Sequence, residues 1–222
     1  MFSIKCSAEV KRACPLFRGA ALMARVSNSS NNEELWGEIT HFSEEYRRKY
    51  TVDSIKQLPA VSATRQAYKS CGKDPSRYRP SGEALCRRIL RGMDLYRVNT
   101  LVDLINLVSI ASGYSIGGFD ADQIQGDELV LGIGRVGEPY EGIGRGMLNI
   151  EGMPVYRDMV GGIGTPTSDH ERTKLSLSTT RLLAIINGYN GDVQHLMQTM
   201  EYMRELLVKY AYATDVEIMT FN

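Results

Sequence analysis

Glycine is concentrated in one part of this 222-residue chain, and this concentration restricts the folds that the chain can adopt. Ten glycines fall between Gly132 and Gly164, with short apolar pairs between them. Glycine in a helix interior costs roughly 1 kcal/mol relative to alanine, whereas tight turns between strands favour it. The segment therefore predicts short strands joined by tight turns.

The remainder of the chain carries helical and strand patterns in alternation. Apolar residues at helical spacing, with polar caps such as Asn32, Ser81 and Asn99 or Thr100, predict five helices: Glu33–Tyr50, Pro59–Ser70, Gly82–Arg91, Leu101–Ala111 and Asp192–Tyr212. Strands are predicted over Phe2–Val10, Leu16–Val26, Glu128–Leu131 and Val216–Phe221. Periodicity leaves Thr179–Asn187 open as a buried strand or a helix start. This mixture predicts an α+β fold in a single domain over residues 1–222.

Composition narrows the class of protein. Apolar residues make up 43% and charged residues 23%, which is ordinary for a globular chain. No apolar run is long enough to span a bilayer, and the N-terminus lacks the pattern of a signal peptide. We therefore expect a cytoplasmic protein that does not associate with a membrane. Four cysteines and three histidines show no zinc-ligand spacing, which predicts reduced thiols, no metal and no cofactor.

Positive charge is gathered in one segment although the net charge is zero. Between Arg47 and Arg97 there are 13 Lys and Arg against 4 Asp and Glu, so this segment carries +9 and the remainder −9. Such a segment can attract a polyanion to one face. Solvated helix faces paired with acidic residues elsewhere are the alternative.

Two short motifs are weak. Gly132–Gly137 matches the GxGxxG pattern of dinucleotide-binding sites, but Glu138-Pro139-Tyr140 follows where a helix is needed, so we reject a dinucleotide site. In Asp169-His170-Glu171 an imidazole stands between two carboxylates, and a surface turn is the favoured interpretation.

The most informative stretch lies between residues 58 and 122. It contains Gly72-Lys73-Asp74-Pro75-Ser76-Arg77-Tyr78-Arg79-Pro80-Ser81-Gly82-Glu83, then Asn99-Thr100-Leu101-Val102-Asp103-Leu104-Ile105-Asn106, and later Gly118-Phe119-Asp120. This stretch resembles the editing (B3/B4) domain of the bacterial phenylalanyl-tRNA synthetase beta subunit, in its free-standing form. The resemblance extends over about residues 55–190, through Gly161-Gly162-Ile163-Gly164 to Thr179-Thr180.

The resemblance implies a layered α+β sandwich with flanking helices and a pocket that hydrolyses a wrongly attached amino acid from tRNA. Asn106 matches the pocket asparagine of the family. The glycine-rich turn implies a wall along which the aminoacyl group approaches the backbone, and the substrate-binding residues expected from it are Gly117, Gly118, Gly161, Gly162, Gly164 and Thr165.

An aminoacyl ester is already activated, so backbone N–H groups in a glycine-rich turn can stabilise its oxyanion without an ionisable side chain. Asp120 or Glu138 is the candidate general base. For Asp103 and Asp120 the structural alternative is helix capping and turn stabilisation. Arg79, Arg87 and Arg88 are assigned to RNA phosphates, with internal ion pairs as the alternative. Tyr78 lies in a turn-rich connector, Asp74–Pro80, and either stacks on a terminal base or packs the connector onto the core.

The chain departs from the synthetase pattern at two positions. Gly117 stands where the family has a histidine, and Ile185 and Ile186 stand where the substrate-recognising glutamate is expected. A trans-acting aminoacyl-tRNA deacylase is the leading hypothesis, with tRNA or aminoacyl-tRNA as partner. A non-catalytic module that binds an amino acid, aminoacyl-tRNA or a protein partner in translation is the second hypothesis. Hydrolysis of a small aminoacyl or amide substrate is the third.

Overall fold

The structure, a computed structural model, describes residues 1–222 and contains six α-helices and ten strands. The helices are α1 (Ala8–Ala13), α2 (Glu33–Lys49), α3 (Pro59–Ser70), α4 (Ser81–Leu90), α5 (Thr100–Ser112) and α6 (Val193–Ala211). The strands are β1 (Ser3–Cys6), β2 (Arg18–Arg25), β3 (Ile116–Asp120), β4 (Glu128–Ile133), β5 (Glu141–Gly142), β6 (Gly146–Met147), β7 (Pro154–Arg157), β8 (Gly162–Gly164), β9 (Arg181–Gly188) and β10 (Thr214–Phe221). Short 3-10 turns are η1 (Ser54–Gln57), η2 (Ala121–Gln123) and η3 (Glu171–Thr173).

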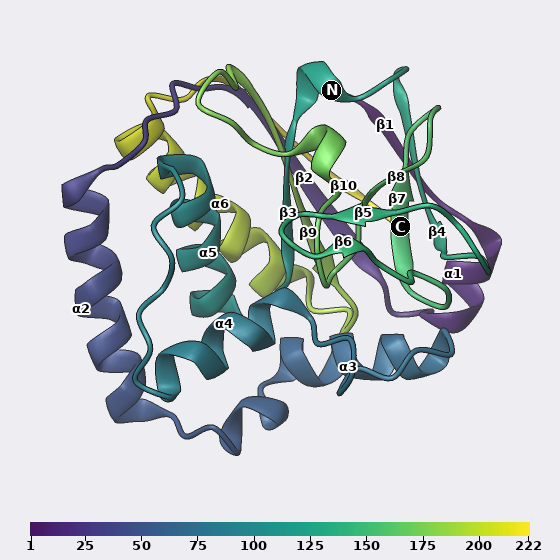
Figure 1. The fold of residues 1–222 in the computed structure, drawn as a ribbon, viewed down its shortest axis with the longest axis horizontal. Helices are drawn as coiled ribbons and strands as arrows, with labels where there is room; N and C mark the ends of the chain where they lie inside the picture. The colour runs from purple at the N-terminus through teal and green to yellow at the C-terminus, as the bar shows by residue number, and fades with distance from the viewer.

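Two four-stranded sheets and a layer of helices build the molecule (Figure 1). One sheet has the order β1-β4-β7-β8, and the other has the order β10-β2-β9-β3. All neighbouring strands are antiparallel except β1 and β4, which run parallel. A small hairpin, β5–β6, lies apart from both sheets. The predicted α+β class, with packed sheets and flanking helices, is confirmed.

The sheet that contains β9 is the middle layer, and its strands β2, β9 and β3 are buried on both faces, whereas the edge strand β10 is mostly exposed. One apolar cluster joins the two sheets, with Leu131 from β4 and Leu183 from β9 among its members. A second cluster joins the opposite face of the same sheet to the helices, with Leu182 from β9 and Leu107 from α5 among its members. Neighbouring residues of β9 therefore enter different cores. A strand buried on both faces loses its alternation, which is why periodicity left Thr179–Asn187 open.

Caps place most helix ends where the sequence predicts them. The side chain of Asn32 accepts a hydrogen bond from the backbone N–H of Leu35, 3.0 Å away, and the side chain of Asn99 accepts one from Val102 at 3.1 Å. Gly113, with φ of +77°, ends α5. The helices predicted over Pro59–Ser70 and Asp192–Tyr212 and the edge strand at Val216–Phe221 are confirmed.

Three local predictions are wrong. The strand predicted over Phe2–Val10 stops at Cys6, because the hydroxyl of Ser7 accepts a hydrogen bond from Val10 N–H and caps α1. Ser81 is the first residue of α4 and does not cap it. Arg87, which the assignment to RNA phosphates places on the surface of α4, is buried.

The glycine-rich segment forms short strands and turns, as predicted. Gly132–Gly137 is followed by a turn and β5, with no helix at its end. A Cβ atom at Gly134 would lie 1.9 Å from the carbonyl oxygen of Ile150, so only glycine permits this approach of the two backbones. No helix of the chain is long and apolar enough to cross a membrane.

Candidate functional site

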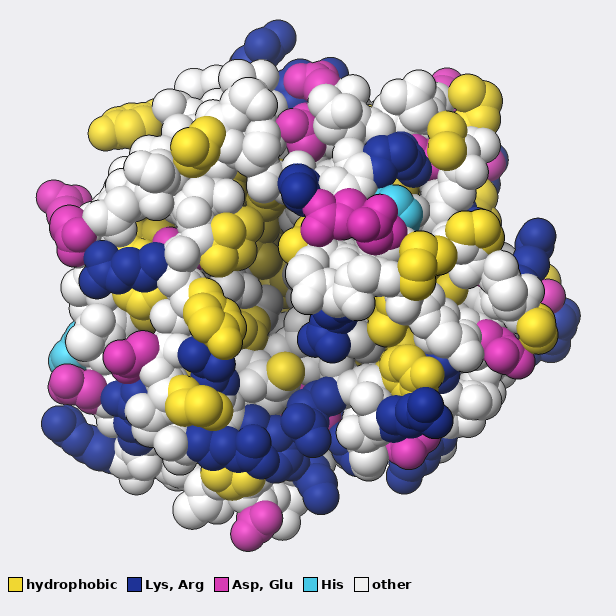
Figure 2. Space-filling view, viewed as in Figure 1, with side chains coloured by type: hydrophobic (Ala, Val, Ile, Leu, Met, Phe, Trp, Pro, Cys, Tyr) yellow, Lys and Arg dark blue, Asp and Glu magenta, His cyan; other side chains and the backbone are white.

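A cavity of about 460 Å³ opens between α5, β3 and the loops around the β5–β6 hairpin and η3. Aliphatic side chains make up much of its wall, and a few polar groups converge on it, which is the usual composition of a small-molecule site. Its lining residues are Ser81, Val98, Val102, Ile105, Asn106, Ser109, Ile116, Gly118, Ile143, Thr165, Ser168, Asp169, Lys174 and Leu175. Figure 2 shows this region as a hollow with an apolar floor.

One face of α5 supplies the first wall. Val102, Ile105, Asn106 and Ser109 follow one another at spacings of three, one and three residues, so they share one side of the helix. Ile105 and Ser109 are buried, and Asn106 is half-buried. The predicted pocket asparagine therefore does line the cavity, and its amide can donate and accept hydrogen bonds there.

Gly118 on β3 forms the facing wall. A Cβ atom at this position would lie 2.5 Å from Ile105 Cδ1 and 3.0 Å from Leu175 Cδ1. Any larger residue would thus fill the space between β3 and α5 or push these side chains into the cavity. The backbone N–H of Gly118 donates a hydrogen bond to Asp169 Oδ2 at 3.0 Å.

Asp169 places an ionisable group in the cavity. Burial raises the pKa of this carboxyl group to about 7, although the hydrogen bond from Gly118 N–H opposes the shift. A carboxyl group with that pKa exchanges its proton near neutral pH. The surface turn predicted for Asp169-His170-Glu171 is therefore wrong for Asp169, because its backbone pairs with Gly164 in an isolated bridge and its carboxyl group faces inward.

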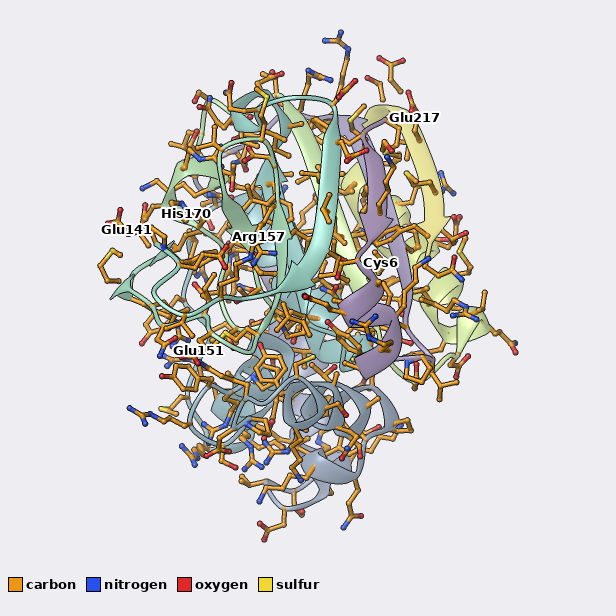
Figure 3. All side chains as sticks on the ribbon, turned by 90° about the vertical axis from the view of Figure 1, so that its right-hand side faces the viewer. Cys6, Glu141, Glu151, Arg157, His170 and Glu217 are labelled. Carbon is orange, nitrogen blue, oxygen red and sulfur yellow. The ribbon has the colours of Figure 1, made fainter.

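The two other residues of this motif do not line the cavity. His170 caps η3 through Nδ1, which accepts a hydrogen bond from Arg172 N–H at 3.0 Å, and its ring lies edge-on to Tyr140. Figure 3 shows His170 beside Glu141 near the β5–β6 hairpin. Burial and the nearby Arg172 lower the pKa of His170. Glu171 pairs with Lys174 at 2.5 Å on the rim.

Thr165 and its neighbours form a rigid turn at the base of the cavity. The hydroxyl of Thr165 donates to the carbonyl oxygen of Ser168 at 3.0 Å and accepts from the backbone N–H groups of Thr167 and Ser168. The hydroxyl of Thr167 donates to the carbonyl oxygen of Tyr78 at 3.1 Å. This bond ties the turn to the connector that precedes α4.

The other predicted substrate-binding glycines surround the cavity without lining it. Cβ atoms at Gly117 and Gly164 would both collide with the ring of Phe119, and one at Gly162 would collide with Tyr140. Gly161 has open space around it. These glycines permit close packing of β3 and β8 behind Asp169, and of the five only Gly118 faces the cavity.

The two carboxylates expected as general bases lie elsewhere. Asp120 is buried, accepts hydrogen bonds from Thr179 Oγ1 at 2.8 Å and from Asp122 N–H at 3.1 Å, and so stabilises η2. Glu138 binds Arg157 through both of its carboxylate oxygens, and this pairing helps to lower its pKa against the effect of burial. The geometry of Asp120 matches the structural alternative of turn stabilisation, and that of Asp103, which accepts from Trp36 Nε1 and Val98 N–H, matches helix-end stabilisation.

The positions where the chain departs from the resembling family also lie outside the cavity lining. Gly117 faces Phe119, and Ile185 and Ile186 are fully buried in β9, one in each apolar cluster. The cavity therefore has no polar side chain from either position. No group of three or more His, Cys, Asp or Glu side chains in residues 1–222 is placed to hold a metal ion.

The arginines assigned to RNA differ in their surroundings. Arg87 is buried and donates from Nε to Glu83 Oε1 at 2.8 Å, so the internal pairing considered as its alternative is present. Arg79 lies close to the same carboxylate, 3.8 Å from Nε. Arg88 donates to the carbonyl oxygen of Asp94 and stacks over the exposed ring of Tyr96. Tyr78 packs against Lys73, whose Nζ lies 3.9 Å from its ring centroid.

Comparisons with known proteins identify the family of the chain. The family model described as the B3/4 domain matches residues 63–220. A solved structure of an N-terminal fragment of the phenylalanyl-tRNA synthetase beta-subunit from Pyrococcus horikoshii is similar at 11% identity and a TM-score of 0.49, over 97% of this chain. The match covers 50% of that fragment, so this chain spans about half its length. No curated protein matches the sequence.

Proposed function

This chain belongs to the B3/4 domain family, and from that premise we propose that it is a trans-acting hydrolase that releases the amino acid from mischarged aminoacyl-tRNA. The observation that carries the proposal is the carboxyl group of Asp169, with a pKa of about 7, inside a cavity that Asn106 and Gly118 also line. A general base with a pKa near the working pH is the group that activation of water requires.

The proposed reaction uses residues of the cavity alone. Ionised Asp169 removes a proton from a water molecule, which attacks the carbonyl carbon of the aminoacyl ester. The amide N–H of Asn106 and backbone N–H groups stabilise the negative oxygen of the tetrahedral intermediate. The C–O bond to the ribose then breaks, and Asp169 returns the proton to the ribose oxygen. The products are the free amino acid and uncharged tRNA.

The proposal transfers the base role from Asp120 and Glu138 to Asp169. The first two are held by Thr179 and Arg157, at positions that do not line the cavity. In the same proposal Asn106 orients the ester, Gly118 leaves room for it, and Thr165 stabilises the turn beneath it. We propose that the whole chain acts as one B3/B4-type domain, in the cytoplasm where charged tRNA is used.

A non-catalytic binding module is the second candidate. Gly117 and the buried Ile185 and Ile186 favour it, because the cavity lacks the histidine and glutamate of the resembling family. Such a module would hold an amino acid, an aminoacyl-tRNA or a protein partner in translation without turnover.

Deacylation of a panel of mischarged tRNAs tests the proposal. We expect release of free amino acid from at least one species, with Asn106→Ala slowing it about 100- to 1,000-fold, the size of effect seen when one donor that stabilises an oxyanion is removed. Asp169→Asn should be slower still and lose the rise in rate from pH 6 to pH 8 that titration of a base near pH 7 produces.

Asp215→Asn is the matched control for Asp169→Asn, because this aspartate is exposed on β10 and pairs with Arg25 on the surface. It should retain the wild-type rate and pH profile. A wild-type protein that leaves every charged tRNA intact, yet binds one of them with an affinity that Asn106→Ala weakens, would establish the binding module instead.

A further inference from the structure

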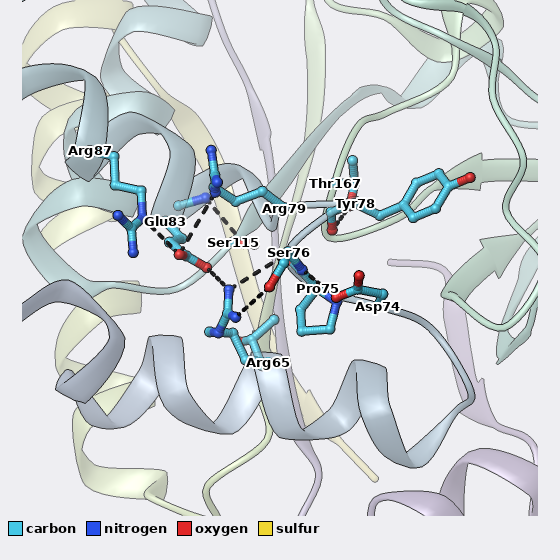
Figure 4. Close-up of polar contacts among 12 residues, drawn as sticks. Arg65, Asp74, Pro75, Ser76, Tyr78, Arg79, Glu83, Arg87, Ser115 and Thr167 are labelled. Atoms are coloured by element: carbon cyan, nitrogen blue, oxygen red, sulfur yellow. Dashed lines mark hydrogen bonds and ion pairs between the residues drawn. The ribbon is translucent and has the colours of Figure 1, made fainter. Parts of the chain in front are cut away.

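Three arginines surround one buried carboxylate beside the cavity (Figure 4). Glu83 on α4 accepts a hydrogen bond from Arg65 Nη1 through Oε2 and one from Arg87 Nε through Oε1, both at 2.8 Å. Arg79 Nε lies 3.8 Å from Oε1, too far for a hydrogen bond. Arg65 also contacts the connector through Ser76 Oγ and the carbonyl oxygen of Pro75.

The cluster holds more positive charge than its acidic partner neutralises. Three guanidinium groups carry +3 against the −1 of Glu83. The side chains of Glu83, Arg87 and Arg65 are only 1%, 9% and 14% exposed, whereas that of Arg79 is 39% exposed and only its Nε is buried. Excess charge that is removed from water is costly unless a counter-charge accompanies it. Glu83 thus balances one arginine charge and leaves two, one in the buried pair Arg65 and Arg87 and one on the partly exposed Arg79.

Hydrogen-bond donors remain unused in the same place. Arg79 Nε is buried and has no hydrogen-bond partner in the chain. Arg87 reaches Glu83 through Nε, which leaves the two terminal nitrogens of its fork for another acceptor. Guanidinium forks of this kind match the oxygen spacing of a phosphate group.

The cluster adjoins the proposed substrate cavity. Arg79 precedes Ser81 by two residues, and Ser81 is the first residue of α4 and lines the cavity. The carbonyl oxygen of Pro166 accepts the Ser81 N–H, in the loop between the cavity residues Thr165 and Ser168. In Figure 2 a broad group of Lys and Arg side chains lies directly below the apolar hollow.

We propose that Arg65, Arg79 and Arg87 form a binding site for a single phosphate group, with Glu83 holding the guanidinium groups of Arg65 and Arg87 in place by hydrogen bonds. Arg79 and Arg87 supply the free donors, and Arg65 supplies charge and fixes the connector. Arg88 is not part of this site, because its guanidinium group stacks on Tyr96 and bonds to Asp94.

The assigned occupant is a phosphodiester near the 3′ end of an RNA whose terminal nucleotide enters the cavity. This assignment rests on the proposed function, whereas the phosphate site itself rests on the cluster. A free phosphate compound offers the same chemistry, so the experiment compares inorganic phosphate with the trinucleotide 5′-CCA-3′.

Isothermal titration of the full-length protein with each probe tests the site. We expect saturable binding of both, with Arg79→Gln weakening it about tenfold, since a hydrogen bond to a charged group is lost. Arg79→Gln should also lower the slope of log affinity against log salt concentration for the trinucleotide by about 1. Arg79 makes no hydrogen bond to the fold, so this variant should unfold at the wild-type urea concentration.

Arg204→Gln is the matched control, because the side chain of Arg204 on α6 is 40% exposed, close to that of Arg79, and pairs only with Glu201. It should bind both probes as the wild type does. Tighter binding of the trinucleotide than of phosphate supports RNA as the occupant, and equal binding of the two supports the phosphate site while overturning the RNA assignment.

Absence of saturable binding, or equal affinities of wild type and Arg79→Gln, would overturn the phosphate site. These results are distinguishable from failure of the proposed function. Phosphate binding without deacylation would contradict the hydrolase activity and support the phosphate site. Deacylation at the same rate in wild type and Arg79→Gln would support the hydrolase activity and contradict the phosphate site.

Discussion

At the scale of single residues, Gly118 decides how much space the cavity has. Its backbone serves two purposes at once: the missing side chain leaves room beside Ile105 and Leu175, and the N–H group binds Asp169. Glycine is required here for close approach and not for an unusual backbone angle, because its φ lies outside the positive region.

Gly118→Ala should therefore narrow the cavity. An added methyl group 2.5 Å from Ile105 Cδ1 must displace it, at a cost of about 1–3 kcal/mol in unfolding free energy. We expect a loss of about tenfold or more in affinity for a non-hydrolysable aminoacyl-adenosine, measured by calorimetry. Gly161→Ala is the control, because no atom lies within 4 Å of the added carbon. Equal affinities of the two variants would contradict a cavity on this side of β3.

Only some of the residues that line the cavity were predicted from the sequence. Asn106, Gly118 and Thr165 were identified from the resemblance and do line it, whereas Asp169 was interpreted as part of a surface turn. Nothing in Asp169-His170-Glu171 distinguishes an inward aspartate from an outward one. The distinction comes from the bridge between Gly164 and Asp169, a contact between backbones that the local sequence does not encode.

At the scale of elements, caps and turn glycines were the most reliable signals. α3 begins at Pro59 and ends at Ser70 as predicted, since proline favours the first helical turn and Gly72, with φ of +89°, follows the last one. α1 was missed because it is only six residues long, too short for a periodic pattern to appear.

Glycines in two helical settings should respond to alanine with opposite signs. Gly37 is exposed within α2 and has no atom within 4 Å of an added Cβ, so Gly37→Ala should stabilise the protein by about 0.5–1 kcal/mol. Gly72→Ala should destabilise it by about 1 kcal/mol, because alanine is strained at φ of +89°. Urea unfolding measures both. If Gly37→Ala lowered the free energy of unfolding, helix propensity at this position would not be what limits the stability of α2.

At the scale of the whole molecule, the buried carboxyl group of Asp169 links stability to pH. Its pKa is about 7 in the folded state against 3.8 as the ordinary value, so between these pH values the folded protein holds a proton that the unfolded chain has released. Stability should fall as pH rises through this window. His170 acts in the opposite direction near pH 6.5, because its folded pKa is lowered.

Comparison of wild type with Asp169→Asn isolates this effect, since both share His170. The wild type should lose unfolding free energy relative to the variant between pH 5 and pH 8, as measured by urea unfolding at each pH. The difference between the two proteins should stop changing above about pH 8. Parallel profiles across the range would show that Asp169 titrates at its ordinary pKa and would remove the basis for its role as a base.

The α+β class, most helix boundaries and the turn-rich glycine segment follow from the sequence, and the resemblance to the B3/B4 domain pointed to Asn106. Caps, periodicity and backbone freedom depend on neighbours within a few residues, and the resemblance depends on short motifs of the sequence. Features of both kinds can therefore be predicted without the structure. Only the tertiary structure decided which acidic residue faces the cavity and which arginines share a carboxylate. Asp169 meets Gly118 across 51 residues, and Arg65 meets Glu83 across 18. Such pairings are set by the packing of strands and helices against one another, and that packing depends on the whole chain.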